Sequence, residues 1–445
     1  MKYNNCSHNI QIMKKISALL LLLLMMTGYY RSFAQESLSL SLDAARQYAI
    51  DYNKVLKNAS LAVDVADKVY WERISAGLPR VDATMDYTNF LGAEIEIKFG
   101  EDMPPTKIPF KPTSNLSLTV AQLIFNGSYL VGLQAAKISR DMSETNFRRT
   151  ELQIKEQVAL AYYSVLVAEK SVDIIQQNLE NIKDIYDKTN TMYKVGMAEI
   201  TDVDQMSVQV TTLENAAKSL QRQVEMAYNL LRIQLGVTAE TKLTLTESLE
   251  DIMARMDHLK TLTTPLELNE NLDYKLMNSQ QLISKKLVDM EVMSWIPTIN
   301  GFYSNTQKIL RPDFDMTPPN ILGLQMNVPI FASGMRKAKW DQARINYEVT
   351  LNDKDLLTDQ LLIQEKQLRF NLNTAIEQYE SQKENVIVSK RVFDNLNLKY
   401  EQGLVSSLDL TTANSNYLQS ETNYITATMQ LLNADLALNK LLNTL

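Results

Sequence analysis

Two stretches decide the fold: YKVGMAEITDV at residues 193–203 and YEQGLVSSLDL at residues 400–410. The second begins 207 positions after the first, and both place a tyrosine three residues before a glycine and an aspartate six residues after it. The same offset aligns Gly127 with Gly334. A repeat of this length indicates a duplicated domain, because solenoid units are only about 20–50 residues long.

The segments around the two glycines are predicted to be long helical hairpins. Four stretches contain neither glycine nor proline: 133–195, 197–235, 335–402 and 404–445. Apolar residues recur every seven positions, as at Val158, Val165 and Val172, which predicts helices packed on one another as in coiled coils. At 1.5 Å per residue the longest helices would reach about 100 Å. Gly196 and Gly403 then mark the turns at the two tips.

Four short segments alternate between apolar and polar residues. Leu322, Leu324 and Met326 alternate with Gly323 and Gln325, and three comparable segments run from Val81, Leu116 and Ile299, the last with weaker alternation. Such strands fit a membrane barrel, with one face toward lipid and one toward the lumen. Two soluble hairpins packed on a core are the alternative. Since four strands cannot close a barrel and open edges cannot face lipid, the barrel reading requires two, three or four copies of the chain.

The first 34 residues resemble an export signal. Lys14 and Lys15 precede an apolar run at 16–26, and Ser32-Phe33-Ala34 provides a cleavage site. A membrane anchor is the alternative, but it normally needs about 20 apolar residues. The segment holds four of the 45 basic residues and no acid, so the remaining 41 basic and 52 acidic residues give the mature chain a formal charge of −11. An acidic exported chain is a poor nucleic-acid binder.

Residue types exclude most catalytic and metal chemistry. Cys6 and His8 lie within the predicted signal, so the mature chain would keep only His258 and no cysteine. Disulfide scaffolds, zinc–thiolate sites and multi-histidine metal cages are therefore excluded. His258 lies between helical segments and is expected to be an exposed polar residue. We expect no enzyme and no cofactor.

The order strand, strand, long hairpin, repeated once, resembles the TolC family of outer-membrane efflux channels, as do Gly196 with Asp202 and Gly403 with Asp409. The resemblance implies an α+β membrane protein that forms a homotrimer. Four strands from each chain would build a 12-stranded barrel in the outer membrane of a Gram-negative bacterium, above a periplasmic coiled-coil tunnel of 12 helices. It implies a passive conduit that docks a periplasmic adaptor and an inner-membrane pump. A periplasmic adaptor protein and an exported coiled-coil scaffold are the alternatives.

The resemblance also assigns roles to residues near the tips. The adaptor-docking residues would be Val195, Gly196, Met197, Gln402, Gly403 and Leu404. The gate and lumen residues would be Thr201, Asp202, Tyr400 and Asp409. In a homotrimer, rings of the Asp202 and Asp409 carboxylates would favour the passage of cations.

This sequence departs from the family pattern at two gate positions. Val405 stands where an arginine partners the gate aspartate, and Thr412 stands where a second acid is found. The closed state must then be held without that ion pair, with Tyr400 as the candidate. An alternative reading makes the acids simple helix caps, in capping boxes Thr201-x-x-Asp204 and Ser406-x-x-Asp409.

The expected organisation of the chain follows from these assignments. The predicted units are a signal peptide at 1–34, a first periplasmic helix at 35–78, a first strand pair at 79–126, a first long hairpin at 127–236, an equatorial linker at 237–265, a short helix at 266–295, a second strand pair at 296–331 and a second long hairpin at 332–445.

Overall fold

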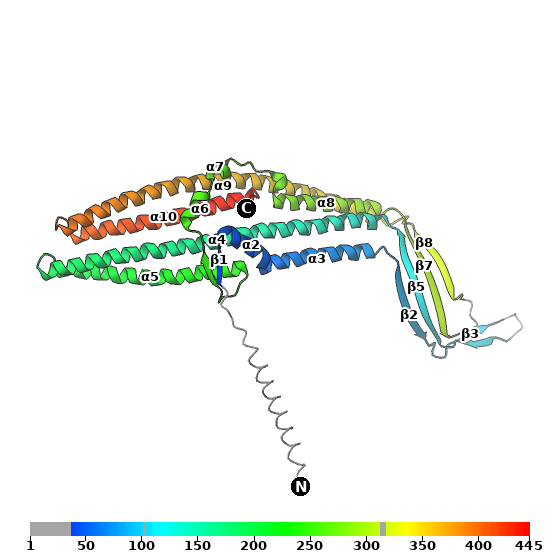
Figure 1. Cartoon of the computed structure of the whole chain (residues 1–445). Helices are drawn as coiled ribbons and strands as arrows, with labels where there is room; N and C mark the ends of the chain where they lie inside the picture. Colours follow the sequence, from blue (N-terminus) through cyan, green and yellow to red (C-terminus); the bar gives the residue numbers. More distant parts are fainter. Residues whose placement is uncertain (1–36, 99, 101–103, 312–316) are drawn as a thin grey trace, which may run out of the picture.

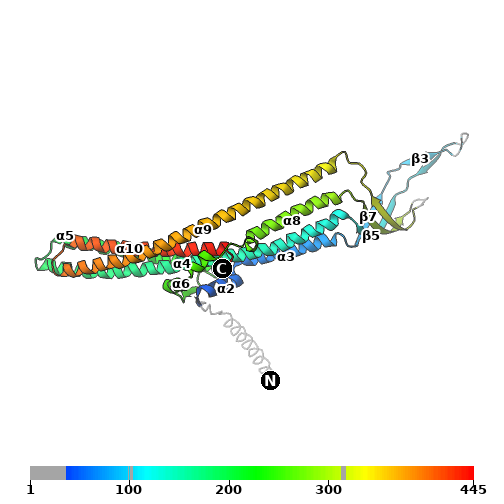
Figure 2. The same ribbon diagram turned by 90° about the horizontal axis from the view of Figure 1, so that it is seen from above.

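The computed structural model describes residues 37–98, 100, 104–311 and 317–445, so the predicted signal peptide lies outside the described residues. The chain forms an elongated rod with helical tips at one end and a β-sheet at the other (Figures 1 and 2). The first repeat contains α3 (Lys54–Ser75), β2 (Arg80–Thr88), β5 (Thr113–Phe125), α4 (Gly127–Lys194) and α5 (Ile200–Leu235). The second contains α8 (Leu272–Met293), β7 (Thr298–Leu310), β8 (Asn320–Asn327), α9 (Met335–Glu401) and α10 (Ser407–Leu441).

The predicted duplication is confirmed by the lengths of the helices. Helices α3 and α8 both have 22 residues, α4 and α9 have 68 and 67, and α5 and α10 have 36 and 35. Each long helix packs along the helix that follows it, and α4 also contacts α10, which places the two hairpins side by side (Figure 1). No helix among the described residues is both long enough and apolar enough to cross a membrane.

An asparagine performs the same structural task in both repeats. The side-chain oxygen of Asn53 accepts hydrogen bonds from the first turn of α3, and that of Asn271 does so for α8. The amide nitrogen of Asn53 donates to the carbonyl of Gln234 at 2.7 Å, and that of Asn271 donates to the equivalent carbonyl of Leu441 at 3.2 Å. Each asparagine is buried, so it caps one helix and fastens the end of another.

The four main strands form one antiparallel sheet in the order β2-β5-β7-β8. Its two outer strands, β2 and β8, each have one neighbour. The pairing of Val81 with Val120 and of Met85 with Leu116 places the apolar residues of β2 and β5 on one face, and Tyr303 with Leu322 continues that face.

Hydroxyl, amide and carboxylate groups, the last from Asp82 and Asp86, lie on the opposite face of this sheet. Thr119 is hydrogen bonded to Ser304, and Ser117 to Thr306, each at 3.0 Å between the side-chain oxygens. Beyond the sheet, β3 (Glu94–Ile97) and β4 (Thr106–Pro109) form a separate two-stranded ribbon (Figure 1). The alternation in the sequence therefore separates a mainly apolar face from a mainly polar one.

The middle of the rod contains more helices and strands than the sequence analysis predicted. The predicted single helix at 35–78 is preceded by β1 (Ser37–Leu40) and α2 (Leu42–Tyr52), and β1 pairs in parallel with β6 (Lys242–Leu245). The predicted linker also contains α6 (Leu249–Arg255) and α7 (His258–Thr263). β1, β6, α6 and α7 have only four to seven residues, which are too few to show a hydrophobic period, so their formation depends on tertiary contacts.

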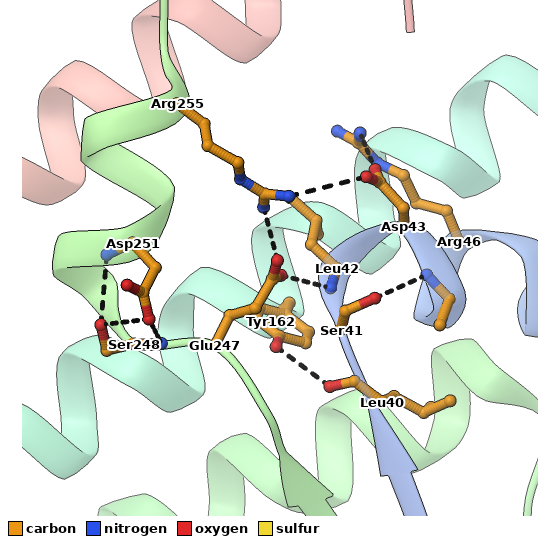
Figure 3. Close-up of polar contacts among 11 residues, drawn as sticks. Leu40, Ser41, Leu42, Asp43, Arg46, Tyr162, Glu247, Ser248, Asp251 and Arg255 are labelled. Atoms are coloured by element: carbon orange, nitrogen blue, oxygen red, sulfur yellow. Dashed lines mark hydrogen bonds and ion pairs between the residues drawn. The ribbon is translucent and has the colours of Figure 1, made fainter.

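An ionic clasp holds these middle segments together (Figure 3). The Glu247 carboxylate accepts a hydrogen bond of 2.8 Å from the backbone N–H of Leu42, at the start of α2, and an ion pair of 2.8 Å from Arg255. Below them, the Tyr162 hydroxyl donates to the carbonyl of Leu40 at 3.1 Å. Burial, with the nearby Glu247 charge, raises the pKa of Tyr162 to about 12, so the hydroxyl remains a donor at neutral pH.

Three apolar cores stabilise the described helical part of the rod, and the smallest consists of Leu372, Ala375, Leu431 and Leu438 on α9 and α10. The equatorial core, at the level of the clasp, joins β1, α2, α4, α5, β6, α6 and α10, and its fully buried members include Val158, Tyr162, Leu235 and Leu432. The tip core lies near the two turns and contains Ile182, Ile185, Met206, Leu213, Phe393, Tyr400, Leu410 and Ala413.

Glu247→Ala should lower the thermal unfolding temperature of the purified protein. The change removes the acceptor of the Leu42 N–H and the nearer of the two carboxylates that Arg255 reaches, the other being Asp43 at 3.8 Å, a loss of about 1–3 kcal/mol. Glu267→Ala is the control, because the Glu267 carboxylate makes no hydrogen bond or ion pair within the described residues. Equal melting temperatures for the two variants would show that the clasp does not stabilise the rod.

Candidate functional site at the helical tips

The two tips have the same backbone geometry. Gly196 and Gly403 have φ values of +79° and +72°, in the left-handed region that favours glycine. The N–H of Met197 donates to the carbonyl of Met192 at 2.8 Å, and that of Leu404 donates to Lys399 at 3.0 Å. Each turn is thus a Schellman motif, which ends the ascending helix and releases the chain toward the descending one.

Apolar side chains project into solvent at both turns. Val195 and Met197 in the first tip are 67% and 69% exposed, and Leu404 and Leu408 in the second are 68% and 63% exposed. Gly196 and Gly403 have no atom within 4 Å of the position that a Cβ would take. An exposed apolar cluster at the end of a rod is typical of a surface that binds another protein.

The descending helices begin with equivalent capping contacts. Asp202 accepts a hydrogen bond of 3.1 Å from the N–H of Glu199, and Asp409 accepts one of 3.2 Å from the N–H of Ser406. The expected box Ser406-x-x-Asp409 is confirmed, whereas Thr201-x-x-Asp204 is wrong, because α5 begins at residue 200 and its cap is Glu199. The 207-residue offset contained this signal, since it aligns 199 with 406 and 202 with 409.

The two aspartates have different surroundings. Asp202 also accepts a hydrogen bond from the Ser407 hydroxyl, so it connects the first hairpin to the second. Hydrogen bonds from the Ser406 side chain and backbone hold the pKa of Asp409 below its ordinary value. The charged cap therefore contributes stability at neutral pH, and this contribution is lost as the pH falls through the lowered pKa.

Tyr400 is buried between the hairpins, where its hydroxyl lies 2.7 Å from that of Thr189 on α4. Thr189 in turn donates to the carbonyl of Ile185 at 2.8 Å, so the pair is hydrogen bonded within the chain. A groove of about 580 Å³ runs beside it, lined by Asp187, Lys188, Thr191, Met192, Tyr400 and Glu401. Tyr193, which the repeat aligns with Tyr400, is 42% exposed.

Further polar contacts between the hairpins were missed by the sequence analysis. Asn178 on α4 and Asn414 on α10 are each 2% exposed and exchange two amide hydrogen bonds, of 2.9 and 3.3 Å. Lys188 reaches Glu401 at 2.6 Å. A single asparagine or lysine gives no sequence signal for such a pair, because the two members lie 236 or 213 positions apart.

The described residues contain no group of three or more histidine, cysteine or acidic side chains that could hold a metal ion. The expectation that His258 is exposed is wrong. Its side chain is 22% exposed, and its Nδ1 atom lies 3.7 Å from Asp435 on α10. Helix α7 brings it there by packing against α9 and α10.

A comparison with models of known protein families identifies the family that has this architecture. The family model described as outer membrane efflux protein matches residues 45–237 and 284–444, which is most of the chain. The chain therefore belongs to the outer membrane efflux protein family. The predicted resemblance and fold class are confirmed, and this is a family of channels without enzymatic activity.

Individual relatives are distant in sequence but close in fold. The outer membrane protein TolC of Salmonella enteritidis is 22% identical over 315 residues, covering 67% of this chain and 63% of that protein, so the chain matches less than two thirds of its relative. A membrane protein from Pseudomonas aeruginosa has a TM-score of 0.77 at 15% identity, covering 92% and 94% of the two chains. The open state of the Neisseria gonorrhoeae MtrE outer membrane channel has a TM-score of 0.72 at 15% sequence identity, covering 92% of each chain.

Tyr400→Phe should loosen the tips without unfolding the rod. Losing the hydroxyl removes one buried hydrogen bond, worth about 1 kcal/mol, so amide hydrogen exchange near the end of α9 should accelerate roughly fivefold. Tyr193→Phe is the matched control, because the Tyr193 hydroxyl has no hydrogen-bond partner among the described residues. If both variants exchange at the wild-type rate, the Tyr400–Thr189 contact does not hold the hairpins together.

Proposed function

We propose that this protein is the outer-membrane channel of a tripartite efflux or secretion system. In this proposal it is a passive conduit from periplasm to exterior, which opens when an adaptor docks at the helical tips. The observation that carries the proposal is a four-stranded sheet with one apolar face and two free edges, joined to helices long enough to extend deep into the periplasm.

The position of the apolar residues supports insertion of the sheet into a membrane. On β2 they extend from Val81 to Tyr87, toward the far end of the strand, whereas on β8 they extend from Leu322 to Met326, toward the helices. The apolar stripe therefore crosses the hydrogen-bonded rows diagonally. Strands in a closed barrel are tilted by roughly 35–45°, so a stripe parallel to the membrane must cross the rows in this way.

The free edges support assembly with other copies of the chain. Pairing β8 of one copy with β2 of the next would satisfy the backbone groups that each edge leaves open. Below the sheet, α3 exposes Val55, Val65 and Trp71, and α9 exposes Ile345 and Val349. Three copies joined in this way give a barrel of twelve strands, consistent with the family's fold.

The tips support docking of an adaptor. Val195, Met197 and Leu404 expose apolar surface at the end of the rod that lies farthest from the sheet, as Figure 1 shows for the turns that they occupy. A periplasmic adaptor, itself joined to an inner-membrane pump, would cover these side chains. Gly196, Gln402 and Gly403 would then shape the contact, while the neighbouring groove offers polar groups to the partner.

We further propose that hydrogen bonds, and not an arginine ion pair, hold the gate closed. Val405 packs against the tip core, so the position that carries an arginine in the family is apolar here. Asp202 bonded to Ser407 and Tyr400 bonded to Thr189 would keep the two hairpins together until an adaptor separates them. Thr201 and Asp409 would contribute to the lumen at the same level.

Leu324→Arg should reduce the yield of inserted oligomer, since a cation on the lipid face costs about 2–4 kcal/mol at the bilayer midplane. Gln325→Arg places the same side chain on the opposite face and should insert normally. The measurement is native mass spectrometry of the outer-membrane fraction, with a trimer expected for the wild-type protein. Equal loss in both variants, or a monomeric wild-type protein, would contradict the barrel.

Gly403→Val should abolish export while leaving the oligomer intact. The substituted residue would be forced out of the left-handed region, a strain of about 1–2 kcal/mol confined to the turn, and the exposed surface would be distorted. Gly92→Val is the control for strain alone, because Gly92 has φ +82° and open space around it, between β2 and β3. Wild-type export by a Gly196→Val, Gly403→Val double variant would show that the tips are not the docking site.

A further inference from the structure

Next to the apolar stripe, four uncharged polar residues form a connected cluster on the same face of the sheet. We name Tyr303, Asn305, Gln307 and Asn320 the amide shelf. The register places them together: residues 303, 305 and 307 alternate along β7, and Asn320 is the direct partner of Asn305 on β8. The shelf lies immediately beyond Leu322, on the side of the connection between the two strands.

Three hydrogen bonds fix the geometry of the shelf. The Oδ1 atom of Asn320 accepts from the Tyr303 hydroxyl at 2.9 Å and from Nδ2 of Asn305 at 2.6 Å. The Oδ1 atom of Asn305 accepts from Nε2 of Gln307 at 3.2 Å. Because both contacts of Asn320 use its oxygen, its amide nitrogen must point away from Asn305, so the side chains form one ordered group.

The shelf retains hydrogen-bonding capacity that these contacts do not use. The NH₂ group of Asn320 has two donors and Oε1 of Gln307 is an acceptor, and neither has a partner among the described residues. Tyr303 is 42% exposed, so part of its ring is also available. Oriented donors and acceptors beside an aromatic ring suit a sugar. Its hydroxyl groups can form hydrogen bonds with the amides, and the C–H groups of its ring can pack on the aromatic ring.

The neighbours of the shelf indicate that its ligand is amphiphilic. Across the pairing with β5, Gln307 lies opposite Leu116 and Asn305 lies opposite Leu118, and both leucines belong to the apolar stripe. A molecule that covers both surfaces must present hydroxyl groups next to a hydrocarbon chain. None of the four shelf side chains carries a charge, which disfavours recognition of a phosphate.

From this juxtaposition we propose that the amide shelf binds the sugar headgroup of a glycolipid in the outer leaflet, whose acyl chain lies along Leu116 and Leu118. The proposal rests on the proposed barrel, because only that orientation brings the apolar face of the sheet into the bilayer. The diagonal course of the stripe then places the shelf at the outer edge of the hydrocarbon layer, where aromatic and polar side chains meet lipid headgroups.

The test uses the full-length oligomer in phosphatidylcholine nanodiscs that contain minor, equal amounts of monoglucosyl diacylglycerol and phosphatidylglycerol. Native mass spectrometry measures which lipid remains bound. The wild-type protein should retain the glucolipid roughly tenfold over phosphatidylglycerol, the effect of about two neutral hydrogen bonds. Equal retention of the two lipids, or a preference for phosphatidylglycerol, would overturn the proposal.

Variants locate the binding to the shelf. Asn320→Leu and Gln307→Leu should each lower the preference from tenfold to about threefold or less, because each removes at least one of the hydrogen bonds, and testing both guards against a folding defect in one. Ser304→Val is the matched control, because Ser304 belongs to the same strand but faces the other side, toward Thr119. Wild-type preference in both shelf variants would place the glucolipid elsewhere. If the oligomer does not insert at all, the proposed channel fails; if it inserts without lipid preference, only this inference fails.

Discussion

The backbone hydrogen bonds at the two free edges of the sheet constrain the rest of the molecule. β2 and β8 each satisfy one side within the chain, and a bilayer offers no water to satisfy the other. The order β2-β5-β7-β8 follows from the duplication, since each repeat supplies one antiparallel pair and β5 joins β7 across the repeats. The helices beneath inherit this order, so α3 and α9 lie at its two edges, and both expose apolar residues there.

The two repeats share the same order of helices and strands, but some equivalent side chains have different surroundings. The asparagine latches at Asn53 and Asn271 are nearly identical, as are the glycine turns at the tips. Tyr193 and Tyr400, by contrast, occupy equivalent positions but only the second is buried. The second hairpin therefore packs its tip against the first, and the contacts between the two tips are not symmetric.

Much of the fold could be predicted from the sequence, because its main signals are periodic or repeated. The lack of glycine and proline over long stretches and the 207-residue offset indicated the hairpins, and alternation at Leu322–Met326 indicated a strand. The short elements in the middle gave no such signal. Contacts such as Asn178 with Asn414 depend on how separate helices meet, which no single segment records. The start of α5 was misplaced because glutamate is an uncommon cap.

The length of the hairpins has a mechanical consequence. From the equatorial core near Tyr162 to the end of α4, the helix rises about 50 Å at 1.5 Å per residue. The tips therefore lie far from the equatorial core about which the hairpins could rotate. A rotation of a few degrees there shifts the turn by several ångströms, comparable to the width of a side chain. A small rearrangement at the equatorial core would therefore displace the tips by a larger distance, and the contacts of the tip core would oppose that displacement.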